Sequence, residues 1–474
     1  MEEFDVAVIG AGSAGPKAAR IAARDGARVA IFEESLIGGE CLYTGCVPSK
    51  ALIHSARLWS QIQGAHAFGL PRYAGPGADF AAVMNHARKT IEEVGGGSAV
   101  DSFSRAGITT ICERASFVDP HTVITNKTKR KVTAKQFILC TGSLPTVPDI
   151  PGLAEAGCDT NRTIFDCKTL PARMVVLGGG PIGCELGQVF ARFGSQVTLL
   201  HRGTRILSRD SAESAQVLHD ALVKDGIRII TDVSIERVER HGDVKRLFLA
   251  GHEEPIECDT ILVAAGRHSN VESLNLEAAG VRVDGGRLKT SAALQTNVPH
   301  IWAAGDITTE YQFTHVVSYE GAVAALNACA LLQGKPLIEA DYRVIPRVTY
   351  TDPEVASVGL TPALARVSHG ADAVDVAQFS FKDLDRAIIS GDTAGFVQIV
   401  SLVKGGAIIG AQIAGSQAGS LISEICLAMR AQLSVEDIAL TMHAYPTMPE
   451  AVEAAAYASC HAPLSPNIPR EMLD

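Results

Sequence analysis

Two stretches, VAVIGAGSAG at residues 6–15 and MVVLGGGPIG at residues 174–183, share one pattern and decide the fold. Each begins with an apolar run of β type and passes directly into Gly-x-Gly-x-x-Gly. Glycines at these positions let the backbone turn tightly and approach a pyrophosphate, which then lies at a helix N-terminus, where free N–H groups favour negative charge. The sequence therefore predicts two dinucleotide-binding units in one chain.

The residues that follow each motif support this prediction. The segments 16–27 and 184–195 are rich in small residues and suit closely packed helices, and 29–34 and 197–202 are second apolar strands. A strand, a Gly-rich turn, a helix and a second strand form a βαβ unit, and such units predict parallel sheets. We expect an α/β fold with two Rossmann-like dinucleotide-binding domains.

The end of each second strand distinguishes the two units, because the residue about 20 positions after the first Gly normally meets the adenosine ribose. In the first unit this residue is Glu33, whose carboxylate can accept both ribose hydroxyls and suits FAD or NAD. In the second unit it is His201, followed by Arg202 and Arg205. With no acid and two nearby cations, the second unit favours NADPH over NADH. The alternative is that these charges are only solvated surface groups.

Later segments complete the domain organisation. FILCTGS (137–143) and ILVAAGRHSN (261–270) are apolar strands that end in small-residue turns, and HIWAAGDIT (300–308) is similar but adds Asp306. From about residue 345 the chain changes to alternating strands, followed by the Gly-spaced run 405–419 and an apolar helix. We expect a separate C-terminal α+β domain with faces available for self-association.

Composition excludes several classes of partner. The 474 residues hold 42 Lys and Arg against 52 Asp and Glu, and no basic block of the kind that follows a phosphate backbone occurs. The 11 cysteines are scattered, unlike the dense framework of a small secreted domain. No basic leader precedes the first strand, and no run of 18 apolar residues is free of polar interruption. We expect a cytoplasmic protein without nucleic-acid or membrane partners.

The segment GGECLYTGCVPSK (38–50) places Cys41 and Cys46 five residues apart. Zinc usually needs about four ligands, and no His or second Cys pair lies nearby, so we expect no metal. On a straight helix five residues rise about 7.5 Å, whereas the Cα atoms of a disulfide lie at most about 7 Å apart. The helix start must be distorted to close the bond, and Gly45 permits this. The spacing favours a poised redox couple over an inert disulfide.

In order and spacing, GAGSAG, GGECLYTGCVPSK, GGGPIGCELG, AAGRHSN, AAGDIT, TDPEVASVGLT and HAYPTMPEA resemble the pyridine nucleotide-disulfide oxidoreductases, which include dihydrolipoamide dehydrogenase, glutathione reductase and mercuric reductase. The resemblance covers essentially the whole chain. It implies FAD in the first unit, the nicotinamide nucleotide in the second, and a homodimer whose active sites are shared between subunits. The expected domains are 1–147 with 272–342 for FAD, 148–271 for NAD(P) and 343–474 for dimerisation.

The resemblance also implies roles for individual residues. NAD(P)H would pass a hydride to FAD, and the flavin would reduce a Cys41–Cys46 disulfide, with Cys46 as the flavin-side thiolate and Cys41 as the exchanging thiol. Lys50 would pair with Glu185 and favour the anionic reduced flavin. The residues implied for FAD are Gly10, Gly12, Gly15, Glu33, Lys50, Ala115, Thr141, Gly142, Asp306 and Thr314. Those implied for the nicotinamide nucleotide are Gly178, Gly180, Gly183, His201, Arg202 and Gly266.

One position departs from the family pattern. Disulfide-reducing members usually carry a His before Pro-Thr and a Glu five residues after that His, as acid and base for thiol exchange; here the positions are Tyr445 and Glu450. A phenol is a poor base near neutral pH. The electron acceptor therefore stays open between a small-molecule disulfide and, as in a mercuric reductase-like enzyme, a quinone or metal ion reduced directly from the flavin. A non-catalytic redox-sensing flavoprotein is the third alternative.

The remaining cysteines are interpreted as packing residues. Cys112, Cys140, Cys184 and Cys426 fall in apolar runs or helices, where a free cysteine behaves as a small apolar residue. Cys460, beside His461, is interpreted as an ordinary thiol, with a metal or substrate shuttle as the alternative.

Overall fold

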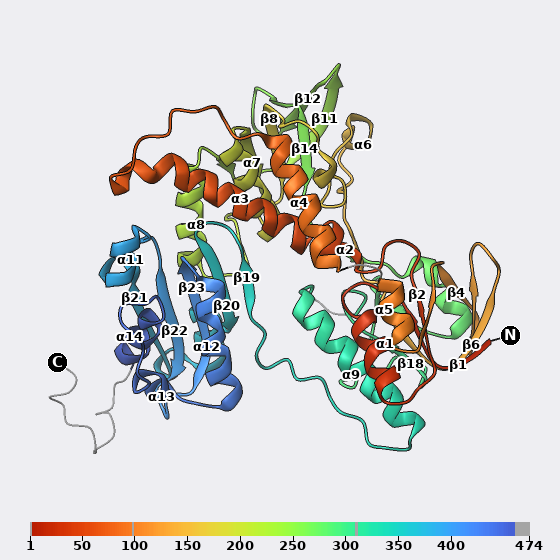
Figure 1. Ribbon diagram of the computed structural model, residues 1–474. Helices are drawn as coiled ribbons and strands as arrows, with labels where there is room; N and C mark the ends of the chain where they lie inside the picture. The colour runs from red at the N-terminus through yellow and green to blue at the C-terminus, as the bar shows by residue number, and fades with distance from the viewer. Residues whose placement is uncertain (1, 97–98, 309–310, 460–474) are drawn as a thin grey trace.

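A seven-stranded sheet carries the first glycine motif in the computed structural model, which describes residues 2–96, 99–308 and 311–459 (Figure 1). The strand order is β3-β2-β1-β6-β5-β4, and β18 also pairs with β6. The strands are β1 (Glu2–Ile9), β2 (Val29–Phe32), β3 (Ile108–Ile111), β4 (Ala115–Asp119), β5 (Thr122–Thr125), β6 (Lys131–Leu139) and β18 (Ile301–Ala303). The pairs that join β3, β2, β1, β6 and β18 are all parallel, as predicted for this unit.

Strands β4 and β5 differ from that prediction. They pair antiparallel with each other, and β5 pairs antiparallel with β6. Pro120 and His121 alone separate β4 from β5, and so short a connection permits a hairpin but no parallel crossover. The prediction of purely parallel sheets was therefore wrong for this edge of the first sheet.

The second glycine motif lies in a four-stranded sheet of order β10-β9-β8-β14, and all its pairs are parallel, as predicted. Its strands are β8 (Arg173–Leu177), β9 (Gln196–Leu200), β10 (Arg228–Ile230) and β14 (Thr260–Val263). The helices of this unit are α7 (Pro181–Phe193) and α8 (Ala212–Lys224), and an antiparallel sheet adds β11 (Ile235–His241), β12 (Val244–Leu249) and β13 (Ile256–Cys258). The chain then returns to the first sheet through β18.

Helices α1 (Gly15–Arg24) and α9 (Thr314–Leu332) pack against each other, and α9 also contacts β6 and β18 (Figure 1). Within the described part of the chain, α9 is the one helix long and apolar enough to cross a membrane by length and composition. Half of its apolar window is buried in the protein. This burial fits a core helix of the first unit.

A pair of helices joins the two units. The chain forms the short helix α2 (Gly39–Tyr43) and then the long helix α3 (Cys46–Gly64), which contacts both α4 (Phe80–Gly95) and α7. Figure 1 shows α3 running from the first unit along the second. The remaining short elements are α5 (Ala99–Arg105), α6 (Leu153–Ala156), β7 (Ser143–Pro145), β15 (Arg267–Ser269), β16 (Val283–Asp284) and β17 (Arg287–Leu288). Helices α2 and α3 therefore form a connection that begins beside the first sheet and ends beside the second.

The C-terminal part is an antiparallel five-stranded sheet of order β19-β20-β23-β22-β21 with helices on it. The strands are β19 (Arg347–Thr349), β20 (Glu354–Gly359), β21 (Val374–Ser380), β22 (Phe396–Leu402) and β23 (Ile408–Gly415), and the helices are α10 (Pro362–His369), α11 (Asp385–Ser390), α12 (Ala418–Ala431), α13 (Val435–Ala439) and α14 (Glu450–Ala458). Ile413 of β23 packs with Ile425 of α12 and Val452 of α14. The predicted α+β domain is present, and the exact domain boundaries stay predictions.

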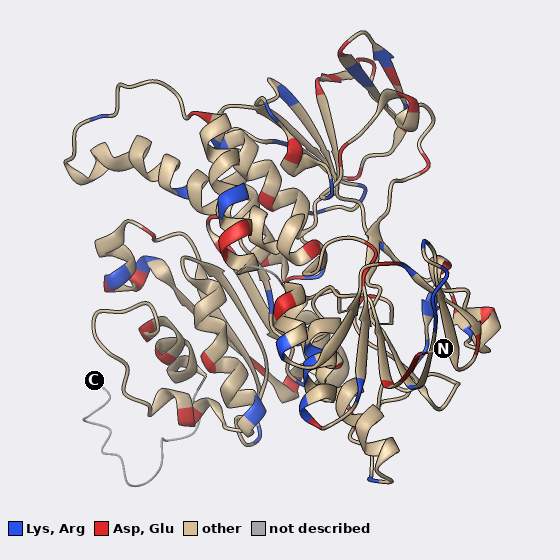
Figure 2. Ribbon diagram, turned by 45° about the vertical axis from the view of Figure 1, so that its right-hand side comes forward, with Lys and Arg blue, Asp and Glu red and all other residues tan. Residues whose placement is uncertain are grey.

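Charged side chains of both signs are spread over the molecule. Figure 2 shows Lys and Arg interspersed with Asp and Glu over helices and loops.

Cys140 and Cys184 are buried, as predicted for packing residues, and Cys426 is partly buried. Cys112 is exposed, which corrects its prediction, because it lies just beyond β3 at the edge of the first sheet. Cys460 and His461 lie outside the described residues.

Both glycine turns are built in the same way. Gly10 follows β1 with φ +101°, and a Cβ added there would lie 2.4 Å from the carbonyl oxygen of Cys140. Gly178 follows β8 with φ +123°, and its Cβ would lie 2.3 Å from the carbonyl oxygen of Ala264. The side chain of any larger residue at either position would clash with the backbone, so only glycine fits there.

The third glycine of each motif gives a testable difference between the units. A Cβ on Gly15 would lie 1.9 Å from the Gly10 carbonyl oxygen, and one on Gly183 would lie 1.9 Å from that of Gly178. We expect Gly183→Ala to weaken nicotinamide-nucleotide binding at least about tenfold, or ~1.4 kcal/mol, while co-purified FAD is retained, and Gly15→Ala to do the reverse. Titration with the nucleotide and the flavin content of purified protein measure both.

Gly187 provides the matched control, since it lies in the same helix α7 and its added Cβ would meet only Val197 and Val176 side-chain carbons at 3.7 and 3.8 Å. Gly187→Ala should leave both measurements unchanged. Equal losses in Gly183→Ala and Gly187→Ala would show that helix packing in general, and not the glycine turn, limits nucleotide binding.

Candidate functional site

One large pocket of about 2300 Å³ joins the two glycine turns. It is more than twice the volume of about 1000 Å³ at the upper end for a single small-ligand pocket. Predicted site residues that line it are Gly10, Gly12, Glu33, Cys41, Cys46, Lys50, Ala115, Thr141, Gly142, Gly178, Gly180, Glu185, His201, Arg202, Gly266, Asp306 and Thr314. Gly15 and Gly183 lie behind the turns, where each packs on a carbonyl of its own turn. The fold thus brings together most of the predicted residues.

The cysteine pair lies at a break between two helices. Cys41 belongs to α2, and Cys46 is the first residue of α3. Between them Gly45 has φ −141° and ψ −113°, outside helical values, and a Cβ there would lie 2.9 Å from the Glu40 carbonyl oxygen. The helix start is therefore interrupted, as the spacing of the cysteines predicts. Both cysteines are free thiols in this structure.

A single hydroxyl group contacts both sulfur atoms. Oγ1 of Thr314, the first residue of α9, lies 3.2 Å from Cys46 Sγ and 3.3 Å from Cys41 Sγ. The hydrogen bond from Cys41, then that from Thr314 and the charge of Lys50, lower the pKa of Cys46 to about 6 against the opposing effect of burial. The same sulfur pairing, with burial, raises the pKa of Cys41. Near neutral pH the pair is one thiolate, at Cys46, and one thiol.

Lys50 and Glu185 form the predicted ion pair. Lys50 Nζ lies 2.8 Å from Glu185 Oε2, and this contact joins α3 to α7. The other carboxylate oxygen of Glu185 accepts the backbone N–H of Tyr350 at 2.9 Å. Lys50 Nζ also lies 4.3 Å from the centroid of the Tyr350 ring. Groups from both nucleotide-binding units and from the C-terminal sheet therefore meet at this ion pair.

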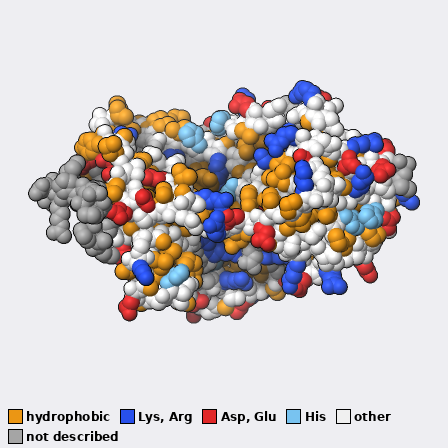
Figure 3. All heavy atoms as spheres, turned by 90° about the horizontal axis from the view of Figure 1, so that it is seen from below, with side chains coloured by type: hydrophobic (Ala, Val, Ile, Leu, Met, Phe, Trp, Pro, Cys, Tyr) orange, Lys and Arg blue, Asp and Glu red, His pale blue; other side chains and the backbone are white. Residues whose placement is uncertain are grey.

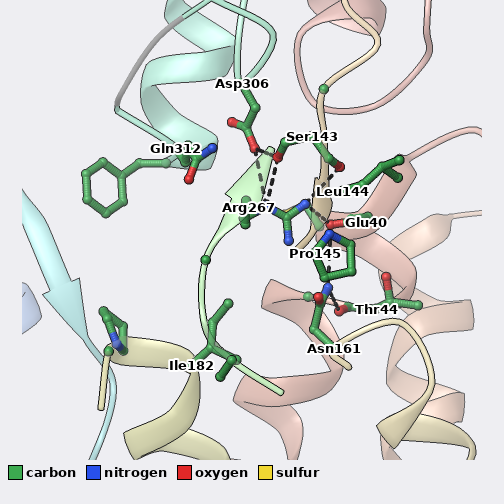
Figure 4. Close-up of a pocket in the computed structure, with 18 of the residues that line it drawn as sticks. Glu40, Thr44, Ser143, Leu144, Pro145, Asn161, Ile182, Arg267, Asp306 and Gln312 are labelled. Carbon is green, nitrogen blue, oxygen red and sulfur yellow. Dashed lines mark hydrogen bonds and ion pairs between the residues drawn. The ribbon is translucent and has the colours of Figure 1, made fainter. Parts of the chain in front are cut away.

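A second polar cluster lies around Arg267 (Figure 4). Arg267 Nε donates to Ser143 Oγ at 2.8 Å and lies 3.7 Å from Asp306 Oδ2, and the guanidinium also pairs with Glu40. Ser143 donates to Asp306, while burial raises the pKa of Asp306. Asn161 donates to the backbone carbonyl of Thr44 at 3.1 Å. These contacts hold the helix that carries Cys41 against the rest of the pocket.

Sequence reasoning named only Asp306 in this cluster. Glu40 directly precedes Cys41, and Arg267 directly follows Gly266, so both lie inside motifs that were recognised. A charged residue inside each motif was the signal that could have identified Glu40 and Arg267 as site residues. Ser143 and Asn161 carried none, because their contacts join residues more than 100 positions apart in the chain.

Glu33 and His201 occupy equivalent positions. Glu33 Oε2 accepts the N–H of Ala11 at 2.7 Å, and His201 Nδ1 accepts the N–H of Gly179 at 3.1 Å. Because Nδ1 is the acceptor, the neutral imidazole carries its proton on Nε2. Burial, together with the charge of Arg202, lowers the pKa of His201. The second unit thus holds a neutral donor where the first holds a carboxylate.

The arginines that follow His201 in sequence differ in whether their side chains line the pocket. Arg205 donates to the backbone carbonyls of Leu207 at 2.9 Å and Asp210 at 2.8 Å and does not line the pocket, so the structure does not bring it to the pocket with His201 and Arg202. Backbone carbonyls of the following turn have taken up its donors. Arg202 and Arg209 do line the pocket. Figure 3 shows Lys and Arg side chains gathered near the middle of one face of the molecule.

Tyr445 and Glu450 are not brought to the cysteines within one chain, and neither lines the pocket. Tyr445 is 71% exposed, and its hydroxyl donates to Asp385 Oδ2 at 2.8 Å. This hydrogen bond raises the pKa of Tyr445. Glu450 Oε2 accepts the N–H of Thr447 at 2.6 Å. The side chain of the neighbouring His443 is 7% exposed, its Nε2 lies 2.9 Å from Glu424 Oε1, and it does not line the pocket.

Comparison with known proteins matches residues 4–321 to the pyridine nucleotide-disulphide oxidoreductases and residues 345–456 to their dimerisation domain. The chain belongs to this family. This confirms the resemblance drawn from the motifs and the fold class of two Rossmann-like domains with a C-terminal dimerisation domain. The family uses FAD and NAD(P)H, and its dimerisation domain supports a homodimer.

Two curated relatives and one solved structure illustrate the similarity. The dihydrolipoyl dehydrogenase of Chlamydia muridarum is 37% identical over 470 residues, which is 98% of each chain. The mercuric reductase of Staphylococcus aureus is 35% identical over 457 residues, which is 96% of this chain and 82% of that protein. The structure of the HOCl-induced flavoprotein disulfide reductase RclA from Escherichia coli as a Cu(II) complex matches with a TM-score of 0.86 and 25% identity, covering 96% of this chain and 99% of that one.

The residues present fit both cofactors of the family. A Cβ added to the middle glycine of either turn, Gly12 or Gly180, would meet nothing within 4 Å, and each turn is followed by a helix whose N-terminus faces the pocket region. Glu33 in the first turn suits ribose hydroxyls, and Asp306, Ser143 and Arg267 supply acceptors and donors between the two turns. When bound, FAD supplies two-electron transfer between the nicotinamide and the cysteine pair.

The low pKa of Cys46 gives a prediction for FAD-loaded protein reduced by two electrons. We expect a long-wavelength thiolate-to-flavin absorbance band that is present above about pH 6 and is lost as the pH falls through that value, because protonation removes the thiolate. Lys50→Met should move the midpoint to higher pH, since it removes a cation that stabilises the thiolate. An anaerobic spectrophotometric pH titration measures both midpoints.

Two controls accompany this titration. Cys46→Ala should abolish the band, and Lys50→Arg, which keeps the charge, should move the midpoint less than Lys50→Met. A band that survives in Cys46→Ala would assign it to another donor, and a wild-type midpoint near the ordinary cysteine value of about 8.5 would contradict the lowered pKa.

Proposed function

We propose that this protein relays electrons from a nicotinamide nucleotide through bound FAD to the Cys41–Cys46 couple, as a dihydrolipoyl dehydrogenase-like oxidoreductase. The supporting observation is the pair of cysteine sulfurs at Thr314, which line the same pocket as both glycine turns. Reduction of the disulfide takes up two electrons and one proton and gives the Cys41 thiol and the Cys46 thiolate. The opposite pKa shifts of the two cysteines match these products.

The proposed binding roles follow the two units. Gly10, Gly12, Gly15, Glu33, Lys50, Ala115, Thr141, Gly142, Asp306 and Thr314 would hold FAD, and Gly178, Gly180, Gly183, His201, Arg202 and Gly266 the nicotinamide nucleotide. Lys50, held by Glu185, would place a fixed positive charge near the reduced flavin and the Cys46 thiolate. The cytoplasm, where thiols are kept reduced, is the proposed location.

We infer that NADPH is the preferred reductant. His201 presents a neutral imidazole with a free Nε2–H where a carboxylate would repel a phosphate. Arg202 lines the same pocket and has no hydrogen bond or ion pair to another residue in the described ranges, so its guanidinium is free to bind an anion. These two groups support a site for the 2′-phosphate.

The first glycine unit supplies the design of the test, because its Glu33 shows how a carboxylate fits at this position. We expect His201→Glu to weaken NADPH binding at least about tenfold and to weaken NADH binding little, since the new charge faces the phosphate alone. Arg202→Ala should likewise weaken NADPH much more than NADH. Dissociation constants measured by titration of the oxidised protein check both.

His201→Gln is the matched control, because it keeps a neutral acceptor for the Gly179 N–H. This variant should retain the expected wild-type preference for NADPH over NADH. If His201→Glu and Arg202→Ala changed the affinities for NADH and NADPH equally, neither residue would read the phosphate.

We propose that each active site of the homodimer is completed by the partner. The observation is that Tyr445 and Glu450 lie away from the pocket of their own chain, with Tyr445 largely exposed on the domain that matches the family's dimerisation domain. The same domain carries exposed apolar side chains, including Leu427 at 68% and Met442 at 96% exposure. Such a surface suits a second copy of the same domain.

The Tyr445 hydrogen bond favours a second candidate function. Because Tyr445 donates to Asp385 and its pKa is raised, the phenol stays protonated and cannot serve as a base for thiol exchange. No residue in the described part of the chain donates to its oxygen. An acceptor that needs no base, such as a metal ion or a quinone, suits this arrangement, as in a mercuric reductase-like enzyme.

An acceptor panel with both nucleotides separates these functions. Lipoamide, glutathione disulfide, a quinone and Hg²⁺ are compared in the wild type and in Tyr445→His. General acid–base catalysis contributes about 10²- to 10⁴-fold, so Tyr445→His should raise disulfide turnover at least about tenfold and leave quinone turnover unchanged. The measurement is the steady-state rate of NAD(P)H oxidation.

Tyr445→Phe is the control for the hydroxyl, since it removes the hydrogen bond to Asp385 but supplies no base. It should not raise disulfide turnover. Wild-type turnover of lipoamide equal to that of Tyr445→His would show that the phenol is no obstacle. Negligible oxidation with every acceptor would favour the non-catalytic, redox-sensing alternative.

A further inference from the structure

We propose that Tyr350 is a positioning residue for Lys50: the face of its aromatic ring holds the ammonium group in place beside the Cys46 thiolate. This inference rests on the proposed function, in which that thiolate is the electron-accepting end of the relay. It gives a role to a residue of the C-terminal domain, which lines the same pocket.

Lys50 needs a restraint beyond its ion pair. Its side chain is 35% exposed, so burial alone does not fix it, and Glu185 binds its ammonium group from one side only. The Tyr350 ring centroid lies 4.3 Å from Nζ, within the range of about 6 Å for a cation–π contact. The ring and the carboxylate together define where the charge lies. Without the ring, the flexible lysine side chain can swing toward solvent.

The position of the ring is set by backbone that does not depend on the ring. Tyr350 follows β19, whose residues Arg347 and Thr349 pair with β20. Its N–H donates to Glu185 Oε1 at 2.9 Å, and this bond is made by the main chain. A substitution of the Tyr350 side chain therefore keeps the Glu185 contact and removes the ring alone.

The charges around Cys46 determine in which direction loss of the Tyr350 ring shifts the pKa of Cys46. Lys50 lowers the pKa of Cys46, whereas Glu185 raises it, and Cys41 donates a hydrogen bond to it. Tyr350 itself remains uncharged, because burial raises the pKa of its phenol. If Lys50 moves away, the opposing charge of Glu185 stays, and the thiolate loses stabilisation. Loss of the ring should therefore make Cys46 a weaker acid.

The test compares Tyr350→Leu with Tyr350→Phe, which keeps the ring. In the FAD-loaded protein, reduced with dithiothreitol, the rate of iodoacetamide alkylation of Cys46 is followed against pH by mass spectrometry of the modified peptide. We expect the midpoint to rise in Tyr350→Leu by about half a pH unit, a threefold change in acid dissociation, and to stay at the wild-type value in Tyr350→Phe. Tyr350→Met provides a second ring-free variant, with a longer and unbranched side chain of similar volume.

A double-mutant cycle shows whether Lys50 carries the effect. In a Lys50→Met background, Tyr350→Leu should produce no further shift. A shift of equal size in that background, an unshifted midpoint in both ring-free variants, or an equal shift in Tyr350→Phe would each overturn the inference. A purely structural role would lower the melting temperature without moving the midpoint, and that result also overturns it.

Failure of the proposed function gives a different result. If NAD(P)H does not reduce the cysteine pair, the relay is wrong, yet the alkylation profile still reports whether Tyr350 holds Lys50 beside Cys46. If the relay works and the profile is unaffected by loss of the ring, the relay stands and the role of Tyr350 is refuted.

Discussion

The whole site depends on how closely a helix can approach the strand before it. In both nucleotide-binding units an added Cβ on the third glycine would lie 1.9 Å from the carbonyl oxygen of the first. Only glycine permits this approach, and it places the start of each helix at the carboxyl end of its sheet, facing the common pocket. The cysteine pair and the Lys50–Glu185 ion pair lie where the two units meet.

The sequence allowed prediction of features that are local in the chain. Gly10, Glu33, Gly178 and His201 were found from one strand–turn–helix–strand pattern, because that pattern and the contacts from Glu33 and His201 to the turns span about 20 residues. The β4–β5 hairpin was missed because the prediction extended parallel βαβ units over the whole sheet, although the short connection between these strands excludes a crossover.

Among contacts between distant segments, the Lys50–Glu185 pair was predicted, and only from the family resemblance. Arg205 was expected in the nucleotide site, but its donors bind backbone carbonyls of a turn whose path the sequence does not show. Arg267 and Tyr350 were not predicted, because each meets its partners from another domain, more than 100 positions away in the chain. The exposed position of Tyr445 was not predicted either, and in the homodimer proposed above its contact would be with the second chain.

The hydrogen bonds of Glu33 and His201 to the two turns differ in kind. The Glu33 carboxylate is an acceptor only, whereas His201 accepts the Gly179 N–H only while its imidazole is neutral, because a protonated imidazole has no acceptor left. Burial, with the charge of Arg202, lowers the pKa of His201 and so keeps the imidazole neutral. The shape of the second turn therefore depends on the protonation state of one side chain.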